Sequence, residues 1–121
     1  MIDEVVSMAA EPSRRISITI SSAVRTRTIQ LKLAERLVIG RADDSGPDAP
    51  GLDLTSYGAA EQGVSRVHAA LSYEDGLVYV EDLGSTSGTR LNGLPLTAHQ
   101  KYRLRSQDEL EFGYVRVTMR F

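Results

Sequence analysis

Three short stretches of this chain combine arginine, serine, threonine and glycine in a way that suits the binding of an anion. The first is an apolar run that ends at Arg41, the second covers residues 63–68, and the third is the hydroxyl-rich turn 84–89. A guanidinium is always charged and presents a planar fork of donors, short hydroxyls add further donors, and glycine lets backbone N–H groups approach a ligand. These residue types therefore predict a site for a phosphate-like anion.

Each of these residues also has an ordinary structural explanation. A strand-end arginine such as Arg41 is usually just solvated, and Ser65 with Arg66 suits a surface turn. The glycine before Arg41 and the long loop after it favour a site. His68 lies between two apolar residues, and for it we favour the structural explanation: a buried imidazole that hydrogen-bonds to backbone and fixes its loop.

The sequence contains no evident pair of nucleophile and base. Residues 84–88 resemble the nucleophile elbow of hydrolases, but the central residue is Thr86 and no helix is predicted after it. Ser65 and His68 lie three residues apart where a loop enters a strand, and they do not make a catalytic triad by themselves. The Gly-Lys-Ser or Gly-Lys-Thr of a P-loop is absent. We therefore expect no catalytic residues and no enzyme.

Metal ions and cofactors are not expected either. The chain has no cysteine, which excludes a thiolate metal site or a disulfide framework. Its only histidines are His68 and His99, and the aspartates between residues 43 and 53 lack the spacing of a calcium-binding loop.

Composition limits the classes of partner. The 121 residues, of which 41% are hydrophobic, suit one domain with its own core. The net charge of −2 argues against general affinity for nucleic acid. No apolar run approaches the roughly 20 residues of a membrane span, and no basic region followed by an apolar core begins the chain. We expect a soluble, cytoplasmic monomer that binds neither nucleic acid nor membrane.

The chain divides into a tail or linker, residues 1–13, and a domain, residues 14–121. Apolar and polar residues alternate over 16–20 and 28–33, which predicts half-buried strands. Further short strands are predicted at residues 37–39, 52–54, 69–73, 77–80, 89–91, 94–96, 102–104, 109–112 and 115–119.

Two residue pairs mark tight hairpins between these strands. Asp75-Gly76 suits the positive φ angles of a type I′ turn, and Asn92-Gly93 marks the turn of another hairpin. The loop over 42–62 is far longer than usual, and loops of that length are commonly functional or disordered. Many short strands with almost no convincing helix predict an all-β sandwich.

Taken in register, three segments resemble the forkhead-associated (FHA) domain. They are Ile39-Gly40-Arg41, Ser65-Arg66-Val67-His68 and residues 82–93, and the resemblance covers roughly residues 16–121. It implies a β-sandwich of about eleven strands whose loops at one end bind a phosphothreonine peptide.

The resemblance also implies a role for individual residues. Those implied to contact the phosphate are Arg41, Ser65, Arg66 and Thr86. Those implied to hold the loops in shape are Gly40, His68, Asn92 and Gly93. Ser87 stands where the family usually has an asparagine that fixes the peptide backbone, so we expect Ser87 to take that position and to hold the peptide more loosely.

The physical chemistry of phosphate agrees with this resemblance. Phosphothreonine carries about −1.5 to −2 charges, and each hydrogen bond to it contributes about 1.5–3 kcal/mol. Three or four such bonds, less the ordering of a peptide, give roughly micromolar affinity. We expect a phosphothreonine-binding adaptor in Ser/Thr kinase signalling. The alternative is an FHA-fold interaction domain that binds its partner without phosphate.

Overall fold

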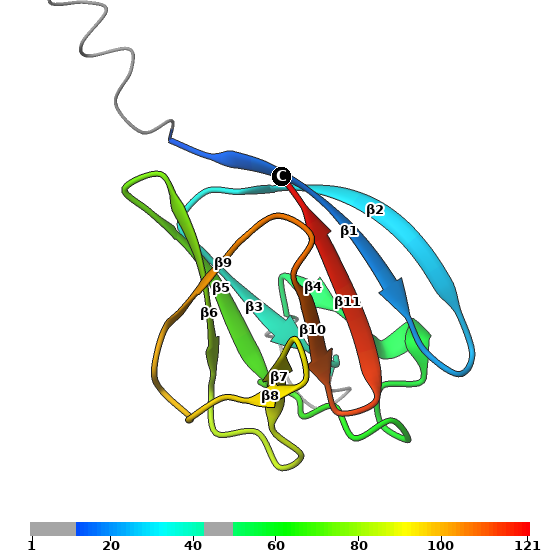
Figure 1. Ribbon diagram of the computed structural model, residues 1–121. Coiled ribbons are helices and arrows are strands. Elements are labelled where there is room, and N and C mark those ends of the chain that lie inside the picture. Colours follow the sequence, from blue (N-terminus) through cyan, green and yellow to red (C-terminus); the bar gives the residue numbers. More distant parts are fainter. Residues whose placement is uncertain (1–11, 43–49) are drawn as a thin grey trace, which may run out of the picture.

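The computed structural model describes residues 12–42 and 50–121. These residues form eleven β-strands and a single turn of 3₁₀ helix, and the strands make two sheets packed face to face (Figure 1). The predicted all-β sandwich of about eleven strands is confirmed. Most of the predicted tail, residues 1–11, lies outside the described residues, and the first strand begins at Arg14.

The larger sheet has six strands and the smaller has five. The six-stranded sheet has the order β2 (Thr26–Leu33), β1 (Arg14–Ser21), β11 (Val115–Arg120), β10 (Glu109–Phe112), β7 (Thr89–Leu91) and β8 (Leu94–Pro95). The five-stranded sheet has the order β4 (Leu52–Asp53), β3 (Arg36–Gly40), β5 (Ala69–Glu74), β6 (Leu77–Asp82) and β9 (Tyr102–Leu104). Every neighbouring pair for which a register is defined is antiparallel except β3 with β4.

Alternating side chains from both sheets form the core. On β1 the isoleucines predicted to face inward are fully buried, and Ile18 lies opposite Met119 of β11, which is also buried. Leu71 and Val80 enter the same core from the five-stranded sheet. Since each buried aliphatic side chain contributes about 1.5–3 kcal/mol, this inward-facing pattern is what holds the two sheets together.

The two predicted hairpin turns are present. Asp75 and Gly76 have φ angles of 51° and 81°, and Asn92 and Gly93 have φ angles of 49° and 85°. Positive φ at both central residues defines the type I′ turn, which matches the twist of the strands on either side. These short connections fix the register of β5 with β6 and of β7 with β8.

The described part of the long loop that follows β3 packs against the sandwich through several buried side chains. Leu54 and Ala59 are fully buried, and a short 3₁₀ helix at Thr55–Tyr57 buries Tyr57 as well. This helical turn is not among the elements predicted from the sequence. None of the described residues belongs to a helix long and apolar enough to cross a membrane.

Candidate functional site

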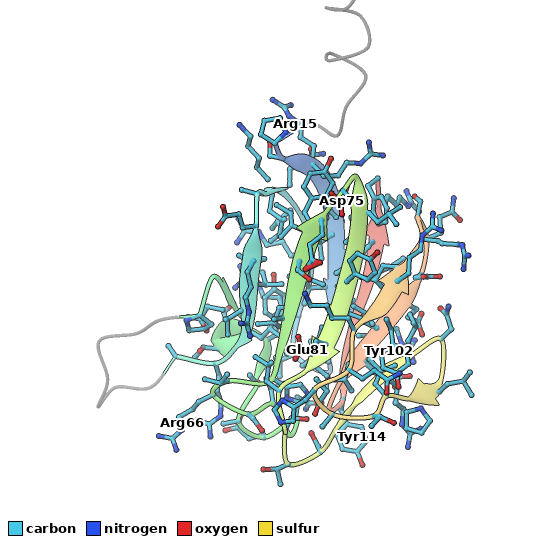
Figure 2. All side chains as sticks on the ribbon, turned by 90° about the vertical axis from the view of Figure 1, so that its left-hand side faces the viewer. Arg15, Arg66, Asp75, Glu81, Tyr102 and Tyr114 are labelled. Carbon is cyan, nitrogen blue, oxygen red and sulfur yellow. The ribbon has the colours of Figure 1, made fainter. Side chains whose placement is uncertain are left out.

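Three neighbouring strands of the smaller sheet bring the predicted phosphate contacts to one end of the molecule. Ile39 of β3 lies opposite Ala69 of β5, and Ala69 lies opposite Asp82 of β6. The segments that follow β3, precede β5 and follow β6 therefore leave the sheet at the same end. They carry all four residues: Arg41, Ser65, Arg66 and Thr86. Figure 2 shows Arg66 at this end of the molecule.

Arg41 follows directly after β3 and is held by one backbone contact. Its Nε donates a hydrogen bond of 2.8 Å to the carbonyl oxygen of Val64. Among the described residues this is the only hydrogen bond of the guanidinium, and neither Nη group has a partner there. A guanidinium fixed through Nε presents its two Nη groups as a fork, which suits phosphate oxygens.

Gly40 allows two backbone segments to come into direct contact. A Cβ atom at this position would lie 1.9 Å from the carbonyl oxygen of Arg66, far inside van der Waals contact. Glycine is therefore required here because the two backbone segments approach each other so closely. The result is that the loop carrying Ser65 and Arg66 packs directly against the end of β3, next to Arg41.

Ser65 connects this loop with the loop that follows β6. Its Oγ accepts a hydrogen bond of 3.1 Å from the backbone N–H of Thr86. A hydroxyl that accepts one bond still carries its own proton, so Ser65 can donate to an anion while it is held in place. Thr86 itself is exposed and lies at the bend.

Ser87 makes a second link between the same two loops. Its hydroxyl donates a hydrogen bond to the carbonyl oxygen of Gly63. The Ser87 proton is thus used inside the protein, and the lone pairs of its oxygen are what remains for a ligand. Contact between Ser87 and a peptide backbone stays a prediction.

His68 is fully buried and joins both loops through its two ring nitrogens. Nδ1 accepts a hydrogen bond of 3.0 Å from the backbone N–H of Ser65, so the ring proton must sit on Nε2, which donates to the carbonyl oxygen of Gly88 at 2.8 Å. The ring also meets Phe112 edge-on, with 5.5 Å between centroids. Burial lowers the pKa of His68, against the opposing effects of the Gly88 bond and of the Asp82 carboxylate 4.0 Å away.

Asp82 shapes the turn that carries Thr86 and Ser87. Its buried carboxylate accepts hydrogen bonds from the hydroxyls of Ser85 and Thr89, at 2.6 and 2.7 Å, and from the amides of Gly84 and Ser85, at 3.0 and 3.1 Å. Burial alone raises the pKa of Asp82, but these hydrogen bonds outweigh it and the pKa is lowered. No role was predicted for Asp82, although an aspartate followed by short polar residues is a sequence signal for such a turn.

A second aspartate without a predicted role fixes the backbone just after Arg41. Asp53 accepts hydrogen bonds from the amide of Ala42, at 3.1 Å, and from the amide and hydroxyl of Thr55. These bonds outweigh the effect of burial and lower the pKa of Asp53. Because β4 pairs in parallel with β3, Asp53 lies opposite Gly40, which places its carboxylate where it can hold the exit of β3.

Comparison with known proteins identifies the family. The family model of the FHA domain matches residues 37–113, which include every predicted site residue. This chain belongs to the FHA-domain family. The predicted resemblance is therefore confirmed.

Two curated relatives share part of their length with this FHA domain. Protein FraH of Nostoc sp. is 40% identical over 75 residues, which are 62% of this chain and 25% of FraH. The probable E3 ubiquitin-protein ligase dma1 of Schizosaccharomyces pombe is 36% identical over 67 residues, which are 52% of this chain and 25% of that protein. The chain thus corresponds to about a quarter of each relative.

Solved structures of FHA domains superpose on most of the chain. One, from work on phosphothreonine-dependent FHA domain interactions, has a TM-score of 0.67 at 25% identity and covers 89% of this chain and 97% of its own. The FhaA FHA domain, complexed with the intracellular domain of Rv3910, has a TM-score of 0.65 at 26% identity and covers 87% and 99%. Full-length yeast Pml1p has a TM-score of 0.72 at 18% identity and shares the fold, covering 98% and 89%.

Asn92 and Gly93 of this FHA domain follow β7, at the end of that strand away from the loops that carry Ser65 and Thr86. The Asn92 side chain donates a hydrogen bond of 3.0 Å to Asp108 and accepts one of 2.9 Å from the amide of Glu109. These contacts tie the β7–β8 hairpin to the start of β10. Any effect of Asn92 on the phosphate contacts must therefore pass through β7.

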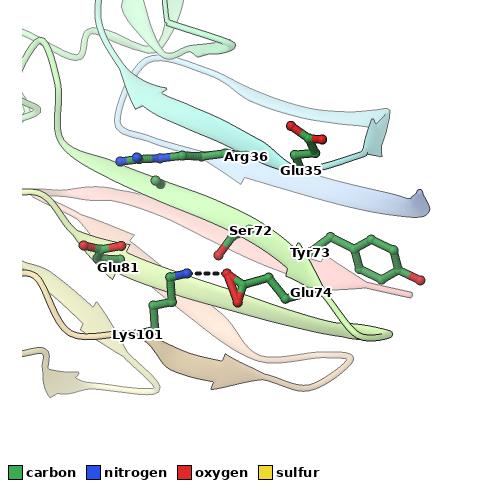
Figure 3. Close-up of a pocket in the computed structure, with 8 residues that line it drawn as sticks. Glu35, Arg36, Ser72, Tyr73, Glu74, Glu81 and Lys101 are labelled. Atoms are coloured by element: carbon green, nitrogen blue, oxygen red, sulfur yellow. Dashed lines mark hydrogen bonds and ion pairs between the residues drawn. The ribbon is translucent and has the colours of Figure 1, made fainter. Parts of the chain in front are cut away.

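One hollow on the surface of the FHA domain adjoins the site and another lies away from it. A small one of about 180 Å³ lies beside Ser87, and the exposed ring of Tyr114 forms part of its wall. A larger one of about 290 Å³ lies over Ser72 of β5, on the outer face of the five-stranded sheet (Figure 3). An ion pair between Lys101 and Glu74 lies along it. The smaller hollow adjoins the loops that carry the predicted phosphate contacts.

No candidate metal centre is found in the part of the chain that the structure describes. Within residues 12–42 and 50–121, no three histidine, aspartate or glutamate side chains gather where they could hold an ion. The carboxylates of Asp53 and Asp82 instead accept hydrogen bonds from backbone and hydroxyl groups.

Proposed function

We propose that this FHA domain binds phosphothreonine in partner proteins and acts as an adaptor in Ser/Thr kinase signalling. The observation that carries this proposal is the Arg41 guanidinium, held through Nε with both Nη groups available, on the end where Ser65 and Thr86 also lie. FHA domains are interaction modules, and one similar structure comes from work on phosphothreonine-dependent interactions. In this role the domain would act in the cytoplasm as a monomer.

The available donors suit a dianionic phosphate. The two Nη groups of Arg41 would hold two of its oxygens, and the Ser65 hydroxyl would donate to another, because its acceptor side is already bonded to Thr86. Arg66, which follows Ser65 on the same loop, adds positive charge. Hydrogen bonds to a charged group contribute about 1.5–3 kcal/mol each, so three of them, less the ordering of a peptide, give roughly micromolar affinity.

The same contacts support binding without catalysis. A base for Ser65 would need a free ring nitrogen, yet His68 uses Nδ1 to accept from the Ser65 amide and Nε2 to donate to Gly88. Neither nitrogen faces the Ser65 hydroxyl as an acceptor. We infer that His68 positions the loop and that Ser65 serves as a donor.

Calorimetry with matched peptides tests the proposal. A library of peptides with a fixed phosphothreonine would first supply a ligand, which is then compared with its unmodified and phosphoserine forms. We expect roughly micromolar binding of the phosphothreonine form and at least about a thirtyfold loss in Arg41→Ala, since one charge-assisted contact contributes about 2–3 kcal/mol. Arg27→Ala, which removes an exposed arginine from β2, is the matched control and should bind normally.

Two results would refute the proposal. Equal binding of the phosphorylated and unmodified peptides would favour a partner that is recognised without phosphate. Unchanged affinity in a folded Arg41→Ala variant would remove Arg41 from the site.

A further inference from the structure

A hollow with three arginines lies at the end of the sandwich opposite the candidate phosphate site. It has a volume of about 310 Å³, and its walls come from the start of β1, the start of β6, the end of β9 and the residue after β11. In Figure 2, Arg15 and Asp75, which adjoin its wall residues Arg14 and Gly76, lie at one end of the molecule, and Arg66 and Tyr114 lie at the other. The hollow and the loops are therefore separate surfaces.

The three arginines of this hollow are Arg14, Arg103 and Arg105. All three are exposed, and none takes part in an ion pair or a side-chain hydrogen bond with the described residues. The Arg14 guanidinium lies over the ring of Phe121, 5.6 Å from its centroid, which favours one orientation of this side chain. Three arginines without an ion pair among the described residues thus converge in a chain whose net charge is −2.

The described acidic groups near the hollow make no ion pair with its arginines. Asp108 accepts hydrogen bonds from the amide of Arg105 and from the side chain of Asn92, so its carboxylate is held to the turn after β9. Asp75 stands in the β5–β6 turn next to Gly76 and makes no ion pair with the arginines. Ser106, also in the wall, accepts a hydrogen bond of 3.0 Å from the amide of Phe121 and keeps its own proton as a donor.

One wall of the hollow offers a place for an extended chain. β9 is the last strand of the five-stranded sheet and pairs only with β6, so its other edge has no neighbouring strand among the described residues. Backbone groups on an open edge can pair with an added strand, while the side chains beside the edge select its residues. Here the selecting side chains are Arg103 on the strand and Arg105 just after it.

We propose that this hollow and the β9 edge bind an acidic, extended segment of a partner protein, rich in aspartate or glutamate. The open edge favours a protein segment over other polyanions, because only a peptide backbone can pair with it. Nucleic acid or an anionic membrane would cover more of the protein than the hollow, and the overall negative charge of the chain opposes such a contact.

Peptide titration monitored by NMR tests this proposal. The probe is an acetylated octapeptide that alternates glutamate with threonine, and its control replaces every glutamate by glutamine. We expect a dissociation constant on the order of 100 μM at low salt, weakened by added salt, and about tenfold weaker binding of the control. Amide resonances of residues 76–78 and 103–106 should shift, and those of residues 63–68 and 84–88 should not.

Matched variants distinguish binding in the hollow from a general effect of the protein's net charge. Arg103→Gln/Arg105→Gln should reduce the affinity about tenfold. Arg27→Gln/Arg116→Gln removes the same charge from exposed positions on the six-stranded sheet and should leave the affinity nearly unchanged. Arg41→Ala should also bind the glutamate peptide normally, so the outcome does not depend on the function proposed for the loops.

Several results would overturn the proposal. One is equal binding of the glutamate and glutamine peptides, and another is unchanged affinity in the folded Arg103→Gln/Arg105→Gln variant. A third is a set of shifts confined to residues 63–68 and 84–88. Tighter binding of a single-stranded oligonucleotide or of anionic lipid vesicles than of the glutamate peptide would also overturn it, since the proposed partner is a protein segment.

Discussion

Replacing His68 by alanine should destabilise this FHA domain strongly. The imidazole is fully buried, accepts from the Ser65 amide at 3.0 Å and donates to the Gly88 carbonyl at 2.8 Å. Alanine removes both bonds and leaves two backbone groups without their partners. It also removes the edge-on contact with Phe112, 5.5 Å between centroids.

The size of the effect follows from these contacts. Each orphaned buried polar group costs about 1–3 kcal/mol, and the missing ring leaves a cavity that adds to the loss unless water fills it. A total of about 3–5 kcal/mol is expected for His68→Ala, a large share of the roughly 5–15 kcal/mol that stabilises a typical domain. At about 3–6 °C per kcal/mol, the melting temperature should fall by roughly 10–30 °C.

Urea and thermal unfolding followed by circular dichroism measure this loss. His68→Asn should fall between the wild type and His68→Ala, because an amide oxygen can accept from Ser65 in place of Nδ1. His99→Asn is the matched control: His99 is exposed, and asparagine tolerates its φ of 63°. A loss below about 1 kcal/mol in His68→Ala would show that the two bonds do not hold the loops as inferred here.

Three further predictions concern the same loops. The pKa of His68 is lowered from 6.5, so below about pH 6.5 the unfolded chain binds more protons than the folded protein. Urea unfolding should therefore show full stability above about pH 6.5 and a decline below it. An equal decline in His68→Asn would assign the effect to another group. Gly40→Ala places a Cβ 1.9 Å from the Arg66 carbonyl oxygen, so peptide affinity and melting temperature should both fall. Wild-type values in both assays would mean that the loop carrying Arg66 can move away without loss of stability. Ser87→Ala removes the hydrogen bond to Gly63 and should cost about 1 kcal/mol in unfolding free energy, with about a fivefold loss of peptide affinity; tighter binding would show that this link restrains the loop unfavourably.

The sequence alone was sufficient to predict the strands and the two hairpins. Alternation with a period of two predicted the buried isoleucines of β1, and Asp75-Gly76 and Asn92-Gly93 predicted two hairpin turns that the structure contains. These signals are local: a strand with one buried face must alternate, and positive φ at two successive residues restricts the residue types. The short 3₁₀ helix at Thr55–Tyr57 was not predicted, because a single turn has no sequence periodicity to detect. Burial of Tyr57 fixes this turn in the folded protein.

The residue types of the site were also visible in the sequence, because glycine, arginine and short hydroxyls are unusual together at strand ends. Their roles were implied by family resemblance, and the contacts behind those roles were not visible. Nothing in the sequence shows that Gly40 touches Arg66, or that the Ser87 hydroxyl is already bonded to Gly63.

Tertiary structure decided the contacts because they depend on strand register. Ile39, Ala69 and Asp82 are far apart in sequence, and only the pairing of β3 with β5 and of β5 with β6 sets them side by side. That pairing places the Ser65 amide at one ring nitrogen of His68 and the Gly88 carbonyl at the other, which fixes the tautomer. A hydrogen bond between loops about twenty residues apart has no local sequence signature, because its two partners meet only after both sheets have formed.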